Sequence, residues 1–352
     1  FNDTATTEIY TRTYTLSLHD ALPISVPVVA TMGQSCPTVA PMITIPETDL
    51  VVHELCLGTN VFGWSADESE SHAVLDAYAA HGGNFVDTAD MYSAWKEGNV
   101  GGESETIIGN WMKSRGNRDQ MVVATKVAKL PTRLGLSPAN IIAACNDSLK
   151  RLQTDHIDIY YAHHDDPTIP LEDVLGAFAQ LIADGKVRYI AASQYTGARL
   201  QEALNISAKN NLPSYIALQD QYNLVSRNPF ESDQQPVLAA NNISAIPFYG
   251  LARGFLSGKY REGKVVESVR AEGVKEFATP KGYQILAVMD QIALENKCSV
   301  SAVSLAWLRS NPQLSTPIAS ARTVEQLEEI VQIIDLNPTE IAALNTVSAA
   351  TA

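Results

Sequence analysis

Short apolar segments alternate with amphipathic segments from Leu55 to the C-terminus, and this alternation constrains the fold more than any other feature of the chain. The eight candidate strands are LCLGT (55–59), NFVDTA (84–89), MVVATK (121–126), IDIYYAH (157–163), VRYIAAS (187–193), YIALQ (215–219), SAIPFY (244–249) and STPIA (315–319). Nearly continuous apolar strands with helices between them predict a parallel sheet that is buried on both faces. Eight such units predict a closed (β/α)8 TIM barrel, in which chemistry takes place at the C-terminal ends of the strands.

The amphipathic segments carry apolar residues at three- and four-residue spacing, which predicts helices. The clearest of them are residues 70–83, 103–115, 137–153 and 171–186. Several have helix-end signals. These signals are Ser137 before Pro138 as N-cap and first residue, Gly82 and Gly185 after a last turn, and Thr323 with Gln326 as a capping box.

Residues 42–352 contain no visible domain boundary, so we expect a single barrel domain there. Within it, residues 42–52 (MITIPETDLVV) place apolar residues around a Pro-Glu-Thr-Asp turn, which predicts an N-terminal β-hairpin. Residues 2–25 resemble the translation of a short-read sequencing adaptor, so residues 1–41 are expected to be a non-native or disordered leader with Met42 as the native start. The alternative is a secretion signal, but no basic cluster precedes the apolar stretch.

Composition narrows the function classes. The net charge is −14 and no run of Lys and Arg interrupts the acidic balance, which argues against a nucleic-acid partner. No apolar run approaches the roughly 18 residues of a membrane span. The four cysteines, Cys36, Cys56, Cys145 and Cys298, are far apart and lack CxxC spacing, so we expect buried thiols in a reducing, cytoplasmic compartment.

Four polar residues, Asp87, Tyr92, Lys126 and His163, lie at or just after the C-terminal ends of three predicted strands, 84–89, 121–126 and 157–163. Strand ends meet at one mouth of a barrel, so these side chains are expected to converge. A Lys ammonium beside a Tyr hydroxyl lowers the pKa of that hydroxyl, and a carboxylate can balance the ammonium. Such a group can deliver a proton to an oxygen that gains negative charge, as carbonyl reduction requires, while His163 orients the carbonyl.

The same residues allow other interpretations. Any one of the four could be a structural residue, and residues 163–166 (His-His-Asp-Asp) could bind a metal. Adjacent strand residues point to opposite faces, so the two histidines cannot easily share one ion. We therefore expect no metal, although a metal-dependent barrel hydrolase or lyase stays a competing hypothesis.

The segments at residues 54–70, 82–93 and 101–119 resemble the aldo-keto reductases, and the resemblance extends over residues 43–345. It implies a (β/α)8 barrel that reduces a carbonyl with NAD(P)H, reversibly, without metal or flavin. It also implies that Asp87, Tyr92, Lys126 and His163 are the catalytic tetrad of the family.

The resemblance further implies a cofactor site. Its members are Gly58 and Thr59 on the first strand, Ser193 and Gln194 on the fifth, Gln219 and Tyr249 at the nicotinamide, Leu251, Gly254 and Lys259 at the pyrophosphate, and Ser320, Arg322, Gln326 and Glu329 at the adenosine end. Two residues depart from the family pattern: Gln194 replaces the usual asparagine, and Gly250 replaces a common serine. A cation is unfavourable at a helix start, so Arg322 favours a phosphate and hence NADP(H) over NAD(H). The alternative is an arginine paired with a nearby glutamate.

The substrate is the least determined feature. A small-molecule carbonyl or alcohol is expected, with Trp64 and Trp95 either forming an aromatic wall or packing elsewhere. The long connections at residues 90–101 and 250–279 are expected to cover substrate and cofactor. The alternative function is a cofactor-binding regulatory or redox-sensing subunit, like the potassium channel beta subunits that the resemblance also includes. The oligomeric state, monomer or homo-oligomer, stays open.

Overall fold

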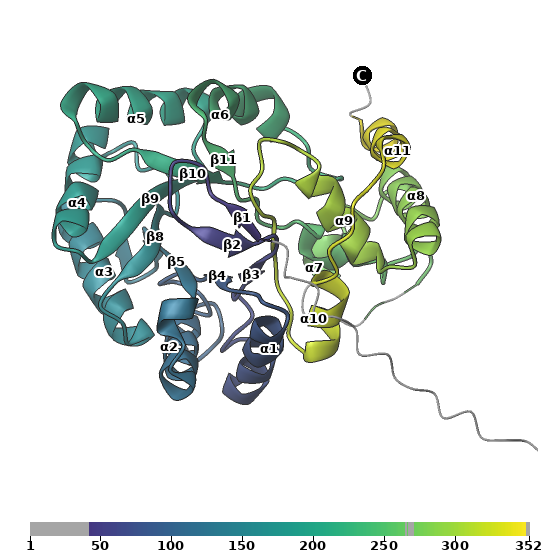
Figure 1. Ribbon diagram of the computed structural model, residues 1–352, viewed down its shortest axis with the longest axis horizontal. Coiled ribbons are helices and arrows are strands. Elements are labelled where there is room, and N and C mark those ends of the chain that lie inside the picture. Colours follow the sequence, from purple (N-terminus) through teal and green to yellow (C-terminus); the bar gives the residue numbers. More distant parts are fainter. Residues whose placement is uncertain (1–41, 265, 267–270, 350–352) are drawn as a thin grey trace, which may run out of the picture. The chain divides into compact units, whose positions relative to one another are not determined.

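The structure is a computed structural model that describes residues 42–264, 266 and 271–349 (Figure 1). The predictions made for residues 1–41, including Cys36, lie outside the described residues.

Eight parallel strands form the barrel, and each overlaps one of the predicted segments. They are β3 (Cys56–Gly58), β4 (Phe85–Asp87), β5 (Val122–Val127), β8 (Ile157–Ala162), β9 (Val187–Ser193), β10 (Tyr215–Gln219), β11 (Ser244–Ala245) and β12 (Ile318–Ala319). They lie in the order β11-β10-β9-β8-β5-β4-β3-β12. The two ends of this sheet meet, because Ala245 N donates to Gln313 O at 2.7 Å and Ile318 N donates to Pro247 O at 2.9 Å. The predicted (β/α)8 barrel is confirmed.

Helices surround the strands (Figure 1). They are α1 (Glu68–Ala80), α2 (Glu103–Arg115), α3 (Pro138–Leu152), α4 (Leu171–Ala183), α5 (Gly197–Asn210), α6 (Gln235–Asn241), α7 (Ala271–Val274), α8 (Pro280–Asn296), α9 (Val300–Arg309), α10 (Val324–Ile330) and α11 (Pro338–Ser348), with short turns of other helix types at η1 (Arg118–Gln120), η2 (Phe230–Gln234) and η3 (Ala252–Ser257). None of the helices in the described part of the chain combines the length and the apolar composition needed to cross a membrane.

The helix-end signals are confirmed with one exception. Ser137 caps α3 by accepting from Asn140 N, as expected. Thr323 caps α10, but the predicted capping box is only half formed. The side chain of Gln326 was expected to accept from the backbone N of the cap residue Thr323. It accepts from the backbone N of the preceding residue, Arg322, at 3.1 Å.

The predicted hairpin is confirmed as β1 (Met42–Thr44) and β2 (Val51–His53), which pair antiparallel and lie across the ring of strands in Figure 1. Its residues Ile45, Leu50 and Val52 are buried in one cluster with side chains from inside the barrel. Burying an aliphatic side chain of this size contributes about 1.5–3 kcal/mol. The hairpin therefore fills the end of the barrel opposite the predicted site.

A second, short hairpin was not predicted. It consists of β6 (Lys129–Leu130) and β7 (Arg133–Leu134) and directly follows β5. Because β5 ends at the mouth of the barrel, the hairpin brings Lys129 to the rim of that mouth.

The described cysteines are free thiols. Cys56 and Cys145 are buried as expected, and burial raises the pKa of Cys145 to about 12. Cys298 is partly exposed, which differs from the expectation, because it lies in the short link between α8 and α9.

Candidate functional site

Lys126 lies at the centre of the candidate site with no exposed surface. Its ammonium Nζ donates to Asp87 Oδ1 at 2.6 Å, to Thr88 O at 2.7 Å and to Tyr92 Oη at 3.0 Å. An ammonium has three N–H donors, so all of them are used. The structure thus brings Asp87, Tyr92 and Lys126 into direct contact and holds the ammonium in one position.

Tyr92 differs from expectation in its acidity. Its hydroxyl also donates to Asp87 Oδ1 at 3.3 Å. Burial, and then the negative charge of Asp87, raise the pKa of Tyr92 well above its usual value of 10. The net shift of this pKa is therefore upward, opposite to the predicted lowering, because burial of the phenolate and the nearby carboxylate dominate in this structure. Tyr92 carries its proton at neutral pH.

His163 directly follows β8, and its ring packs edge-on to Tyr92 with ring centroids 6.1 Å apart. Its backbone N donates to Val127 O at 2.9 Å, which fixes the residue against the end of β5. Burial, with the positive charges of Lys126 and Lys129, lowers the pKa of His163 well below 6.5. The ring is neutral, and its buried Nδ1 has no partner among the described residues.

The residues after His163 have partners that draw them away from a shared metal. Asp165 forms an ion pair with Arg199 at 3.0 Å, and Asp166 accepts from Leu136 N at 2.9 Å. No group of three or more His, Cys, Asp or Glu side chains that could hold a metal occurs in the residues that the structure describes.

A cavity of about 780 Å³ opens beside these residues, within the range of about 300–1,000 Å³ that is usual for ligand sites. Most of the predicted site residues line it. They are Gly58, Asp87, Tyr92, Trp95, His163, Ser193, Gln194, Gln219, Tyr249, Leu251, Gly254, Lys259, Ser320, Arg322, Gln326 and Glu329. The structure therefore gathers predicted residues from seven of the eight barrel strands or their following loops at one mouth.

Three predicted residues do not line this cavity. Lys126 is covered by its partners, and Thr59 is buried with its hydroxyl donating to Asp87 O at 2.8 Å. Trp64 packs edge-on against Trp95, with ring centroids 5.7 Å apart. Trp95 is 44% exposed, lines the cavity and also packs edge-on against Tyr92, so Trp95 contacts the cavity directly and Trp64 only through Trp95.

Gln194, the residue that stands where the family pattern has asparagine, directly follows β9. Gln194 has φ of 56°, a left-handed conformation that asparagine adopts more readily than glutamine. Its side-chain Nε2 donates to His163 O at 3.1 Å. Beside it, Gln219 donates to Asp87 Oδ2 at 2.9 Å, and the buried hydroxyl of Ser193 has no partner among the described residues.

The half of the cavity formed after β11 and β12 is rich in cations. Arg253 lies over the ring of Tyr249 at 5.0 Å and is 3.6 Å from Glu276, and Lys259 lies beside it in the cavity wall. Arg322 has no carboxylate within ion-pair distance in the described ranges, so the glutamate pairing considered for it is not observed. Cationic side chains of this kind fit the phosphates of a dinucleotide.

Two glycines in this half of the cavity let a ligand come close to the backbone, because they have no side chain. A Cβ atom at Gly58 would lie 2.7 Å from both Ile318 Cγ2 and Ser320 Oγ, so only glycine fits there. Gly254 has φ of 101°, which other residues rarely adopt. These positions, with the unpartnered Ser193 hydroxyl, fit an extended polar ligand.

Several lining residues were missed in the sequence. Among them are Asn60, Met91, Lys129, Gln221, Phe248 and Arg253. Most lie within three residues of a predicted strand end or site residue, so a search of every loop after a strand would have found them.

The fold agrees with the known proteins to which the chain is similar. The family model described as "Aldo/keto reductase family" matches residues 54–349. Protein tas of Escherichia coli (strain K12) is 31% identical over 325 residues, which cover 84% of this chain and 93% of that protein.

Two further relatives differ in their described roles. The "Putative voltage-gated potassium channel subunit beta" of Schizosaccharomyces pombe is 36% identical over 72% of this chain and 75% of its own length. An aryl-alcohol dehydrogenase (NADP+) of Phanerodontia chrysosporium is 29% identical over 79% of this chain and 76% of its own length. The family model spans most of the chain, and two of these relatives exceed 30% identity. The chain therefore belongs to the aldo/keto reductase family of oxidoreductases.

Proposed function

We propose that this protein reduces an aldehyde or ketone to the alcohol with NADP(H), and catalyses the reverse oxidation. One observation carries the proposal: the protonated Tyr92 hydroxyl lines the cavity and accepts a hydrogen bond from the buried Lys126 ammonium. A proton donor at the cavity wall, backed by a fixed positive charge, suits an oxygen that becomes an alkoxide.

Each residue of the proposed tetrad has its own part. Tyr92 gives its proton to the carbonyl oxygen, and Lys126 stabilises the phenolate that this leaves, because its ammonium lies 3.0 Å from Tyr92 Oη. Asp87 balances the charge of Lys126, whose ammonium is buried. His163, neutral and in the cavity wall, hydrogen-bonds to the substrate oxygen through a ring N–H and orients it.

A nicotinamide cofactor supplies the hydride when it is bound. Ser193, Gln194 and Gln219 would hold its carboxamide end, and the ring of Tyr249 would stack on it. Lys259 would hold an anionic phosphate. Arg322, with no carboxylate partner among the described residues, supports NADP(H) over NAD(H), as does the name of the aryl-alcohol dehydrogenase relative.

Turnover of 4-nitrobenzaldehyde with NADPH tests the proposal. Tyr92→Phe should lower kcat by about 10²–10⁴-fold because the proton donor is gone. A fluorescence titration with NADPH should give the same Kd for the variant and the parent. Tyr283→Phe, which changes a partly buried tyrosine on α8 outside the cavity, is the control and should keep the parent kcat. A Tyr92→Phe enzyme as fast as the parent would refute the assigned role.

A second candidate is a cofactor-binding regulatory subunit. The observation that favours it is the 36% identity to the relative described as a potassium channel subunit beta. Binding of NADPH without turnover of any compound in a panel of aldehydes and ketones would favour this role over the reductase.

A further inference from the structure

Lys129 is a cation in the cavity wall that the assigned chemistry does not use. It lies in β6 and is half-buried. No carboxylate lies within 4.0 Å of its ammonium in the described part of the chain. The carboxylate that influences it electrostatically, Asp220, already accepts from Gln221 N at 2.7 Å and from Gln234 Nε2 at 2.6 Å.

The position of Lys129 separates it from the proposed phosphate-binding cations. β6 follows β5, and in the closed ring of eight strands β5 lies opposite β11, which precedes Tyr249 and the cation-rich loop. β8, which His163 follows, is the direct neighbour of β5. Lys129 therefore faces the substrate end of the cavity, on the side of Tyr92 and His163.

No carboxylate among the described residues of the cavity wall at this end pairs directly with Lys129. Among the described lining residues that precede Ser193, Lys129 has the only formally positive side chain and Asp87 the only formally negative one. Asp87 is neutralised by Lys126 at 2.6 Å. Burial, together with the charge of Lys126, lowers the pKa of Lys129, so its charge is held in an unfavourable setting. A partly buried ammonium of this kind gains from an anionic partner.

We propose that Lys129 binds a carboxylate of the substrate, so that the preferred carbonyl compounds are oxo-acids or formyl-acids. This inference rests on the proposed reductase function. The remaining lining at this end includes Val61, Met91 and Trp95, which suits an apolar or aromatic body between the carboxylate and the carbonyl.

The test compares 2-, 3- and 4-carboxybenzaldehyde, each with its methyl ester, under saturating NADPH. The parent should prefer at least one acid over its ester in kcat/KM. Lys129→Met keeps most of the apolar stem but removes the charge, and should lower that acid-to-ester ratio by about 10- to 100-fold, mainly through KM of the acid. Lys129→Arg should retain the preference for the acid. Lys209→Met, on the exposed surface of α5, should leave the ratio unchanged.

Each failure has its own signature. Turnover of all compounds with the same ratios in the parent and in Lys129→Met overturns the inference and leaves the reductase function standing. A change in the KM of NADPH with unchanged ratios assigns Lys129 to the cofactor and also overturns it. If the parent reduces neither acids nor esters, the proposed function fails and the inference fails with it.

Discussion

Asp87 connects more of the candidate site than its place at a strand end suggests. Its carboxylate accepts from Lys126, from Tyr92 and from Gln219, so both oxygens are used. A carboxylate with this set of donors holds three other side chains in fixed orientations. We therefore expect substitutions of Asp87 to affect the positions of its neighbours as well as the local charge.

Asp90 is a buried carboxyl group close to Tyr92 in sequence, and neither of its oxygens has a hydrogen-bond partner in the described residues. Burial, and then the negative charge of Glu105, raise the pKa of Asp90 to about 7, although Arg151, Arg133 and Lys126 oppose the shift. A group whose folded pKa lies above its unfolded value of 3.8 favours the folded state at low pH.

Replacing Asp90 with Asn should remove the pH dependence that its raised pKa brings to the stability of the fold. Between pH 3.8 and pH 7 the unfolded chain loses this proton and the folded protein keeps it. The free energy of unfolding therefore falls as pH rises through this window. The loss is on the order of 4 kcal/mol in the free energy of unfolding. Urea denaturation at several pH values should show a smaller fall toward pH 8 in Asp90→Asn than in the parent. Asp119→Asn, at an exposed position, should follow the parent. Parallel profiles for all three proteins would contradict the prediction.

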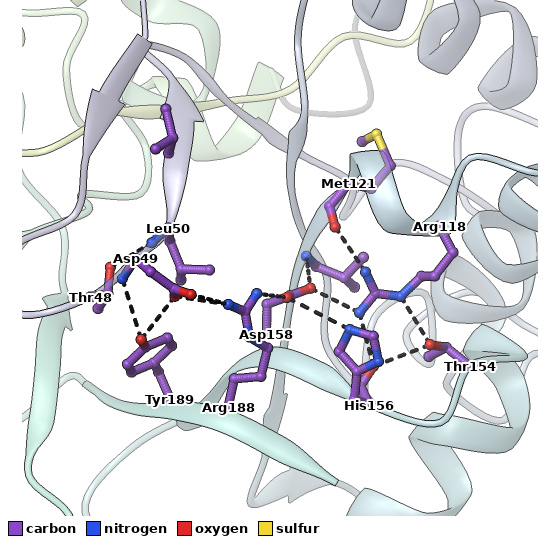
Figure 2. Close-up of polar contacts among 12 residues, drawn as sticks. Thr48, Asp49, Leu50, Arg118, Met121, Thr154, His156, Asp158, Arg188 and Tyr189 are labelled. Atoms are coloured by element: carbon purple, nitrogen blue, oxygen red, sulfur yellow. Dashed lines mark hydrogen bonds and ion pairs between the residues drawn. The ribbon is translucent and has the colours of Figure 1, made fainter. Parts of the chain in front are cut away.

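At the scale of elements, a chain of charged groups joins several segments at the end of the barrel away from the site (Figure 2). Asp158 on β8 is 2% exposed in its side chain and accepts from Arg118 Nη2 and Arg188 Nη1, both at 2.8 Å, and from Val123 N at 2.9 Å. Arg188 continues to Asp49 in the turn of the N-terminal hairpin at 2.8 Å. The network thus links the hairpin, β5, β8 and β9.

Asp158→Ala should lower the free energy of unfolding by about 2–4 kcal/mol, because it leaves two guanidinium groups without their shared carboxylate. The cost is below that of a fully buried pair because Arg188 is 37% exposed in its side chain. Asp155→Ala, at a side chain that is 95% exposed, should change stability by less than about 0.5 kcal/mol. Equal urea midpoints for both variants would mean that the network contributes nothing.

The element that the sequence did not indicate, the β6–β7 hairpin, has strands of only two residues each. Such short strands show no alternation of apolar and polar residues. In the described part of the chain its two strands pair only with each other, Lys129 with Leu134 and Leu130 with Arg133.

At the scale of the whole molecule, the stability of the fold depends on pH through His53, which lies in β2 at the closed end of the barrel. This residue is 1% exposed, its Nδ1 accepts from Leu55 N at 3.0 Å, and its ring packs edge-on against Tyr78. Burial, with smaller effects from Arg309 and His81, lowers the pKa of His53 to about 4. The folded protein therefore resists a proton that the unfolded chain accepts near pH 6.5.

The stability that His53 contributes is present above pH 6.5 and is lost as pH falls toward 4, by about 3 kcal/mol. His53→Gln should weaken this acid sensitivity, while His72→Gln, on a partly exposed side chain of α1, should not. Asp90 has the opposite effect on the free energy of unfolding over nearly the same pH range. His53→Gln should therefore reduce the loss of stability at low pH, and Asp90→Asn should reduce the loss at high pH. A His53→Gln profile identical to that of the parent would contradict the assignment.

The sequence by itself determined the order and kind of the main elements and the convergence of the candidate tetrad at strand ends. Periodicity is a local property of the chain, and in a parallel barrel the strand direction places each strand end at the same mouth. Only the tertiary structure decided the acidity of Tyr92, the covered positions of Thr59 and Trp64, the bond from Gln194 to His163, and the entry of Lys129 into the cavity. Burial, Coulomb interactions and side-chain contacts depend on distances between residues far apart in the chain, and these distances exist only in the folded molecule.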